Sequence, residues 1–124
     1  MAEFTGRELD LMSVLWRLGS GTVAEVRAGL DDELAYTTVL SVLRTLEAKG
    51  HVRHVEEGKA HRYFPRVERA TAGAHGIRRL VDKVFDGSAE ALLTHLVSDR
   101  KLSKAKLTRL RALLDERLRG EEKS

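Results

Sequence analysis

A stretch in the first half of the chain repeats apolar residues at three- and four-residue steps, the spacing of one buried stripe on an α-helix. The stripe is formed by Val39, Val42, Leu43 and Leu46. Gly50 follows it, and glycine readily takes the left-handed conformation found just past a helix C-terminus. The pattern therefore predicts a helix over about residues 36–49.

The opposite side of this helix is expected to be short, polar and mildly basic, with Leu40 as an apolar residue near its edge. Such a face suits the major groove of DNA, where arginine can bond guanine bidentately and a threonine methyl can contact thymine. An ordinary core helix with a solvated hydroxyl face would carry the same residues, so the helix alone leaves both interpretations open. The residues on this face are Thr37, Thr38, Ser41, Arg44, Thr45 and Ala48.

The next residues, about 52–64, have the pattern of a β-hairpin, with two short strands joined by residues 56–59 and a glycine near the tip. Alternation along the second strand puts Tyr63 on one face and both Arg62 and Phe64 on the other. A basic group can then face outward while an aromatic side chain anchors the hairpin. A helix followed by a basic hairpin, or wing, is typical of a winged helix-turn-helix. The candidate phosphate contacts of the wing are Arg53, Lys59 and Arg62.

The N-terminal third predicts two further helices, each preceded by a capping box. Thr5 lies three residues before Glu8 ahead of a strongly apolar segment, and Thr22 lies three residues before Glu25. The glycine-rich residues 19–21 separate the two segments. The order helix, short helix, long helix and hairpin is that of a winged-helix domain.

Charge is unevenly distributed along the chain, although the net charge is only +3. Residues 1–34 carry a net charge of −4, residues 35–66 carry +3, and the remaining residues carry +4. Positive charge thus collects where the helix and the wing should meet phosphate, opposed by Glu56 and Glu57 at the wing tip. This distribution favours double-stranded DNA as the partner.

The composition changes after Pro65. Residues 66–119 contain no proline, and their apolar positions recur with a helical period, which predicts three amphipathic helices, the last two capped by Ser88 and Ser103. Their narrow apolar stripes need a partner, and a second copy of the chain is the simplest one. Packing on the head is the alternative. The expected dimerisation residues are Ile77, Leu80, Val81, Val84, Leu92, Leu93, Leu96, Leu107, Leu110, Leu114 and Leu118.

Together these patterns predict a mainly α fold with a small β-hairpin. We expect a winged helix-turn-helix DNA-binding head over residues 1–66, a helical dimerisation domain over residues 67–120 and a disordered tail over residues 121–124. Basic residues crowd the region 100–119. We interpret them as a solvated face, with a second nucleic-acid surface as the alternative.

Composition excludes other classes of protein. Hydrophobic residues make up 42% of the 124 residues, cysteine is absent, and no apolar run of about 18 residues or charged-then-apolar leader occurs. We therefore expect a cytoplasmic protein without membrane insertion. There is no G-x-S-x-G elbow, Walker loop or H-E-x-x-H pattern, and the five histidines have no cysteine to join them. A binding protein is expected, not an enzyme, with no metal and no cofactor.

Several short motifs make the pattern more specific. They are a helix with a central Trp16, then Thr-Val-Ala-Glu-Val (22–26), Ala-Tyr-Thr-Thr-Val (35–39), Leu-Arg-Thr-Leu (43–46), Lys-Gly (49–50) and His-Arg-Tyr-Phe-Pro (61–65). In these residues the chain resembles the penicillinase repressor family, which includes the methicillin-resistance and copper-responsive repressors. The resemblance covers nearly the whole chain, because the C-terminal helices of the family also have counterparts here.

The resemblance implies a homodimeric transcriptional repressor on an inverted-repeat operator, with the third helix in the major groove and the wing on the backbone. Tyr36 and His61 join the candidate residues mainly on this ground. A winged-helix module that binds another protein, without specific DNA binding, is the alternative. The full set of expected DNA-binding residues is Tyr36, Thr37, Thr38, Ser41, Arg44, Thr45, Arg53, Lys59, His61 and Arg62.

Two family features do not match this sequence. The copper-responsive repressors end in a cysteine-rich metal site, and this chain has no cysteine, which excludes copper sensing by that route. The penicillinase and methicillin repressors are inactivated by cleavage of an Asn-Phe bond in the penultimate helix. That bond would fall at His95-Leu96 here, so the resemblance gives only weak support to an upstream sensor protease as a partner.

Overall fold

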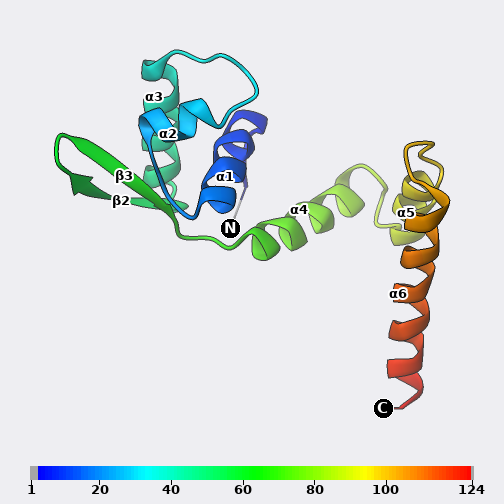
Figure 1. Cartoon of the computed structure of the whole chain (residues 1–124). Coiled ribbons are helices and arrows are strands. Elements are labelled where there is room, and N and C mark those ends of the chain that lie inside the picture. The colour runs from blue at the N-terminus through cyan, green and yellow to red at the C-terminus, as the bar shows by residue number, and fades with distance from the viewer. Residues whose placement is uncertain (1–2, 124) are drawn as a thin grey trace. The chain divides into compact units, whose positions relative to one another are not determined.

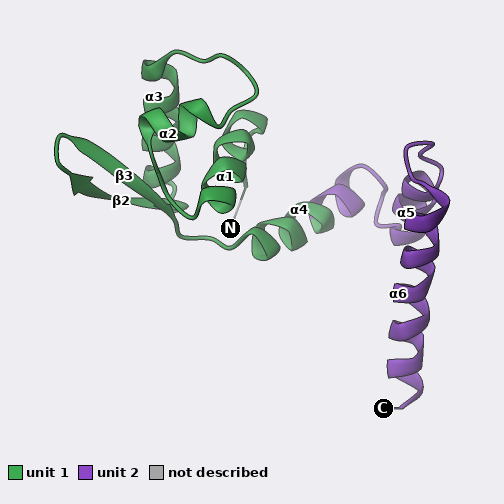
Figure 2. Ribbon diagram, in the orientation of Figure 1, with its two compact units in different colours: residues 1–78 green, residues 79–124 purple. Residues whose placement is uncertain are grey.

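The computed structural model describes residues 3–123, whose contacts divide into two compact units, one ending at Arg78 and the other beginning at Arg79 (Figures 1 and 2). The first unit is a winged-helix head. Its elements are α1 (Gly6–Leu18), β1 (Gly21–Thr22), α2 (Val23–Ala28), α3 (Tyr36–Ala48), β2 (Val52–Glu57) and β3 (Ala60–Pro65). Helix α4 (Arg69–Lys83) crosses the boundary, and α5 (Ala89–Val97) and α6 (Lys104–Glu122) belong to the second unit.

Both capping boxes predicted for the head are present. The hydroxyl of Thr5 accepts a hydrogen bond from the Glu8 backbone N–H at 3.1 Å, and the Glu8 carboxylate accepts one from the Thr5 N–H at 2.8 Å. Thr22 and Glu25 repeat the arrangement at 3.2 and 3.0 Å. Each box satisfies two backbone N–H groups that a helix start leaves free.

The core of the head lies where α1, α2 and α3 meet the sheet. Although the segment is strongly apolar, Leu9 and Leu18 of α1 are exposed, because only one side of the helix faces the other elements. The predicted stripe of α3 is confirmed for Val39, Leu43 and Leu46, which are fully buried. The remaining buried apolar core residues of the head are Leu11, Met12, Val14, Leu15, Val23, Val26, Val52, Tyr63 and Ala72.

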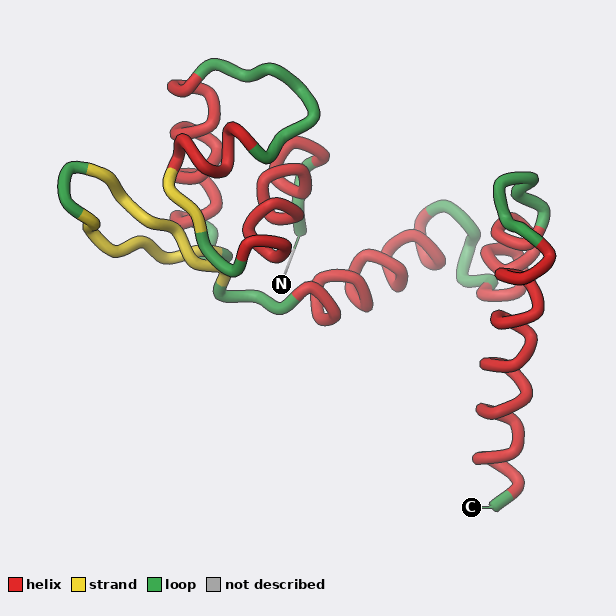
Figure 3. Tube along the Cα trace, in the orientation of Figure 1, coloured by secondary structure: helices red, strands yellow, loops and turns green. Residues whose placement is uncertain are grey.

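The sheet has three antiparallel strands in the order β1-β3-β2, so it contains one strand more than the predicted hairpin. The two residues of β1 carry no strand pattern of their own and pair with Tyr63 and Arg62. Strands β2 and β3 continue up to a turn of only two residues, in which Gly58 has φ 62° (Figure 3). A positive φ at the first turn position matches the twist of a tight hairpin, and glycine takes it without strain.

The chain after the sheet stays on the head beyond residue 66, where we expected the head to end. Trp16 Nε1 donates to the carbonyl of Val67 at 2.8 Å, the guanidinium of Arg69 lies 5.7 Å from the Trp16 ring, and Ala72 is buried. Phe4 packs edge-on against the same indole ring. One aromatic side chain of α1 thereby fixes the path of the chain into α4.

The second unit contains the last two of the three helices predicted after Pro65, and α4, the first, begins in the first unit. Ser88 and Ser103 cap α5 and α6 as expected, each accepting a hydrogen bond from the backbone N–H three residues on. Neither helix has a buried residue. Helix α6 continues through Glu122, into the segment 121–124 that we expected to be a disordered tail, and Ser124 lies outside the described residues. No helix among residues 3–123 is long and apolar enough to cross a membrane.

One ion pair joins the start of α1 to the end of α3. The ammonium of Lys49 lies 2.8 and 3.0 Å from the two carboxylate oxygens of Glu8, whose side chain is only 5% exposed. Burial raises the pKa of Glu8, but hydrogen bonds from Lys49 and Thr5 outweigh it, so the pKa lies below its usual value of 4.5. Lys49 also places a positive charge at the C-terminus of α3, where it complements the helix dipole.

We predict that Glu8→Gln lowers the free energy of unfolding at pH 7 by about 1–2 kcal/mol, because glutamine keeps the cap but leaves Lys49 without a charged partner. Since the folded state lowers the pKa of Glu8, this contribution is present above pH 4.5 and is lost as the pH falls through the folded-state pKa. Urea unfolding followed by Trp16 fluorescence between pH 7 and 3 measures both effects.

Glu33→Gln is the matched control for this experiment, because Glu33 is exposed and makes no hydrogen bond or ion pair within residues 3–123. It should unfold like the wild type across the whole pH range. A difference between the wild type and Glu8→Gln that stays constant down to pH 3 would contradict the role given to the Glu8 charge.

Candidate nucleic-acid interface

The outward face of α3 presents short side chains to solvent. Thr37, Thr38, Ser41, Arg44 and Thr45 are all exposed. Most of this face lines one shallow groove on the surface, formed by Thr37, Leu40, Ser41, Arg44, Thr45 and Ala48. The structure therefore brings the predicted reading residues together on one side of one helix.

Arg44 is the basic residue of this face. Its guanidinium makes no hydrogen bond or ion pair with any part of the chain that the structure describes. The nearby carboxylate of Glu47 is turned to the wing, where it meets His54. Arg44 therefore keeps its five N–H donors for an external acceptor, and two of them can meet the acceptor pair of a guanine edge.

The first turn of α3 is open to solvent. Its N-cap residue, Ala35, provides no side-chain hydrogen bond, and Tyr36 at the first helical position is 48% exposed. The first N–H groups of an uncapped helix, together with the helix dipole, favour an anion such as a phosphate group. Tyr36, added mainly from the family resemblance, thus lies beside a phosphate-compatible helix end.

The basic residues of the wing occupy three different environments. Lys59 lies in the exposed turn and makes no hydrogen bond or ion pair within residues 3–123. The guanidinium of Arg53 lies over the ring of Phe64, its cross-strand neighbour, at 4.4 Å from the ring centre. This contact holds the guanidinium against Phe64, and its N–H groups make no hydrogen bond within residues 3–123, so they can still meet a phosphate.

Arg62 is committed to contacts inside the head. It donates to Glu25 at 2.8 and 3.3 Å, to Glu57 at 2.8 Å and to the hydroxyl of Ser20 at 3.3 Å, and its side chain is only 25% exposed. Hydrogen bonds to Glu25 and Glu57 raise the pKa of Arg62, and the bond from Arg62 lowers the pKa of Glu25. The predicted phosphate contact of Arg62 stays a prediction, and it would require leaving these carboxylates.

The wing is tied to α3 by contacts that the sequence did not indicate. Nδ1 of His54 lies 2.7 Å from both carboxylate oxygens of Glu47, and the His54 backbone N–H donates to the same carboxylate at 3.2 Å. The ring of His61 stacks on that of His54 with 4.3 Å between ring centres. Glu47 and His54 were not among the predicted site residues, because no local motif signals a contact between a helix and the strand after it.

The other polar residues give little support to a metal or ligand site. No group of three or more histidine, cysteine, aspartate or glutamate side chains within residues 3–123 is arranged to hold a metal ion. His51 is buried against Phe4, with 4.5 Å between ring centres, and burial lowers its pKa. His51 is thus a core residue of the head.

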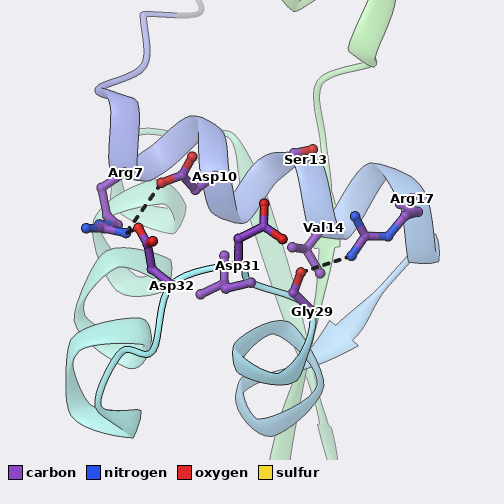
Figure 4. A pocket seen from close by; sticks show the side chains of 9 residues that line it. Arg7, Asp10, Ser13, Val14, Arg17, Gly29, Asp31 and Asp32 are labelled. Carbon is purple, nitrogen blue, oxygen red and sulfur yellow. Dashed lines mark hydrogen bonds and ion pairs between the residues drawn. The ribbon is translucent and has the colours of Figure 1, made fainter.

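A polar hollow of about 210 Å³ lies on a different part of the head, between α1 and the connection from α2 to α3 (Figure 4). Arg7 donates to Asp10 at 3.4 Å and to Asp32 at 3.0 Å, and Arg17 donates to the Gly29 carbonyl at 3.1 Å. Both arginines are therefore engaged with the protein itself. We interpret these hydrogen bonds, which line the hollow, as the contacts that hold this connection against α1.

Most of the predicted dimerisation residues are apolar side chains open to solvent on α4, α5 or α6. Ile77, Leu80, Val84, Leu93, Leu96, Leu114 and Leu118 are exposed, and Val81, Leu92, Leu107 and Leu110 are half-buried. Val97 and Leu113 are exposed apolar residues of the same helices that the prediction omitted. Basic residues of α6 are also exposed and lie around the helix without forming one stripe.

Comparison with known proteins identifies the relatives of this chain. Residues 4–116 match the family model described as penicillinase repressor. The transcriptional regulator BlaI of Mycobacterium tuberculosis is 35% identical over 73% of this chain and 68% of its own length. The penicillinase repressor of Bacillus licheniformis is 22% identical over 92% and 91%. The methicillin resistance regulatory protein MecI of Staphylococcus aureus is 19% identical over 93% and 95%.

Solved structures agree with the fold. The solution structure of the DNA-binding domain of the repressor BlaI superposes with a TM-score of 0.51 and 27% identity, covering 56% of this chain and 87% of that domain. A MarR family protein from Bacillus stearothermophilus has the same TM-score at 19% identity, covering 99% of this chain and 78% of that one, and supports the fold alone. The chain belongs to the penicillinase repressor family of winged-helix transcriptional repressors, as its motifs predicted.

Proposed function

We propose that this protein is a transcriptional repressor that binds an inverted-repeat DNA operator as a homodimer, with α3 in the major groove and the wing on the backbone. The observation that carries the proposal is the outward face of α3, which offers short side chains and the unpaired Arg44 on one exposed surface. Short side chains let a helix lie deep in the major groove, and an acidic side chain there would be repelled by phosphate. None of the residues that form this face is acidic.

The role proposed for each side chain in DNA binding follows from the groups that it can offer to DNA. Arg44 and the hydroxyl residues of α3 face base edges, while Tyr36 and the first turn of α3 meet phosphate. Arg53 and Lys59 contact the backbone from the wing, with His61 beside them. Arg62 holds the wing against α2 through its ion pairs with Glu25 and Glu57.

A dimer is proposed because one head offers a small reading surface. Glu56 and Glu57 precede the wing turn. Glu57 is paired with Arg62, but Glu56 repels phosphate and weakens the binding of a single head. Two heads on half-sites about one helical turn apart read enough base pairs for useful specificity. The exposed apolar residues of α4, α5 and α6 are suited to an isologous contact between two chains.

Release by a sensor protease is not part of the proposal. The bond between His95 and Leu96 lies within α5, and its residues differ from the Asn-Phe pair expected from the family. The rival proposal is a winged-helix module that binds another protein. It predicts no binding to DNA of any sequence, even at low salt, whereas a DNA reader binds and weakens steeply as salt rises.

We predict that Arg44→Ala lowers the preference for operator over random DNA by about 1–3 kcal/mol, because a base-reading arginine discriminates among sequences. Lys59→Ala should weaken binding to both DNAs alike and reduce the slope of affinity against salt by about one counterion, because it loses a phosphate contact. Fluorescence anisotropy with both duplexes over a salt series measures the two effects. Equal losses on operator and random DNA for Arg44→Ala would make Arg44 a phosphate contact.

We predict that the protein sediments as a dimer and that Leu114→Glu converts it to a monomer, because a charge replaces an apolar group in the proposed contact. Leu114 is 50% exposed on α6, and Leu9, which is 44% exposed on α1 of the head, supplies the matched control Leu9→Glu. The control should remain a dimer. Sedimentation equilibrium of the three proteins measures the oligomeric state. A monomeric wild type or a dimeric Leu114→Glu would contradict the proposed dimer contact through α6.

A further inference from the structure

Thr45 lies on the outward face of α3, and its hydroxyl is hydrogen-bonded to the helix itself. Its Oγ1 donates a hydrogen bond to the backbone carbonyl of Ser41, one turn earlier, at 3.1 Å. A threonine hydroxyl has a single proton to donate, and here the helix itself receives it. Thr45 nevertheless remains exposed on the surface of α3.

The hydrogen bond limits what Thr45 can offer to a base. With the proton engaged, the side chain keeps its methyl group and the acceptor lone pairs of Oγ1. As long as this bond is kept, the hydroxyl cannot donate to the acceptors of guanine, to N7 of adenine or to O4 of thymine. The methyl group of Thr45 is not engaged by this hydrogen bond and is available to contact a base.

A second methyl lies beside it. Ala48 follows Thr45 by three residues, which places the two side chains next to each other on the helix surface, and both line the shallow groove of α3. Ala48 is exposed and has only its methyl to present. The two groups form a small apolar spot on a face that otherwise carries hydroxyl groups, Arg44 and the half-buried Leu40.

Thymine is the base whose major-groove edge bears a methyl group. We infer that Thr45, with Ala48, reads the C5 methyl of a thymine in each half-site. The inference rests on the proposed function, since it requires α3 in the major groove. Arg44 precedes Thr45 and lies about 100° away around the helix, so the two residues address different bases. Each half-site then contains a guanine for Arg44 and a thymine for Thr45.

The test uses an operator obtained by selecting bound fragments from genomic DNA. Each thymine of it is replaced, one symmetric pair at a time, by deoxyuridine, which differs only in lacking the C5 methyl. For wild-type protein we expect one pair of positions where affinity falls by about fourfold per half-site, the effect of exposing one methyl group. At the same positions, Thr45→Ser should lose most of the preference for thymine over deoxyuridine, and the Ala48 methyl should account for what is left. Thr45→Val, which keeps a methyl and loses the hydroxyl, should retain the preference.

The outcomes separate this inference from the proposed function. Specific operator binding with no deoxyuridine-sensitive position would overturn the inference alone, and so would a sensitivity that Thr45→Ser leaves unchanged. Loss of the thymine preference in Thr45→Val would overturn it as well, because that variant keeps the methyl group and lacks only the hydroxyl. Failure of the wild type to bind any DNA sequence specifically would overturn the proposed function, and the inference with it.

Discussion

The head depends on a carboxylate that performs two tasks. Glu8 closes the capping box that starts α1, and the same nearly buried carboxylate receives the ammonium of Lys49 from the end of α3. Glu25 repeats the arrangement, because it closes the capping box of α2 and receives Arg62 from β3. Each helix start is thus joined to an element far along the chain, and the local cap and the tertiary fold stabilise each other.

Contacts of this kind explain why the outward face of α3 is available to bind DNA. Lys49 holds the C-terminal end of the helix, Val39, Leu43 and Leu46 bury its inner stripe, and Glu47 holds the wing through His54. Internal contacts therefore use the other faces of α3. What remains is a short, hydroxylic surface with one unpaired arginine, already positioned before any DNA arrives.

Local chemistry made most of this fold predictable. Capping boxes at Thr5 and Thr22, caps at Ser88 and Ser103 and the apolar stripe of α3 are signals within a few residues of sequence, and the structure contains all of them. Contacts between distant residues were not predictable. The two-residue strand β1, the pairing of Arg62 with Glu25 and the indole bond of Trp16 to Val67 depend on which elements meet in space.

We propose that sequence specificity comes from two heads, which contacts between the apolar residues of α4, α5 and α6 of two chains hold in fixed register. Inserting five base pairs between the operator half-sites tests this most directly, because it turns one half-site to the opposite side of the duplex, where ~10 base pairs make one turn. We predict that affinity falls to that of a single half-site. Undiminished affinity for the expanded operator would contradict the account.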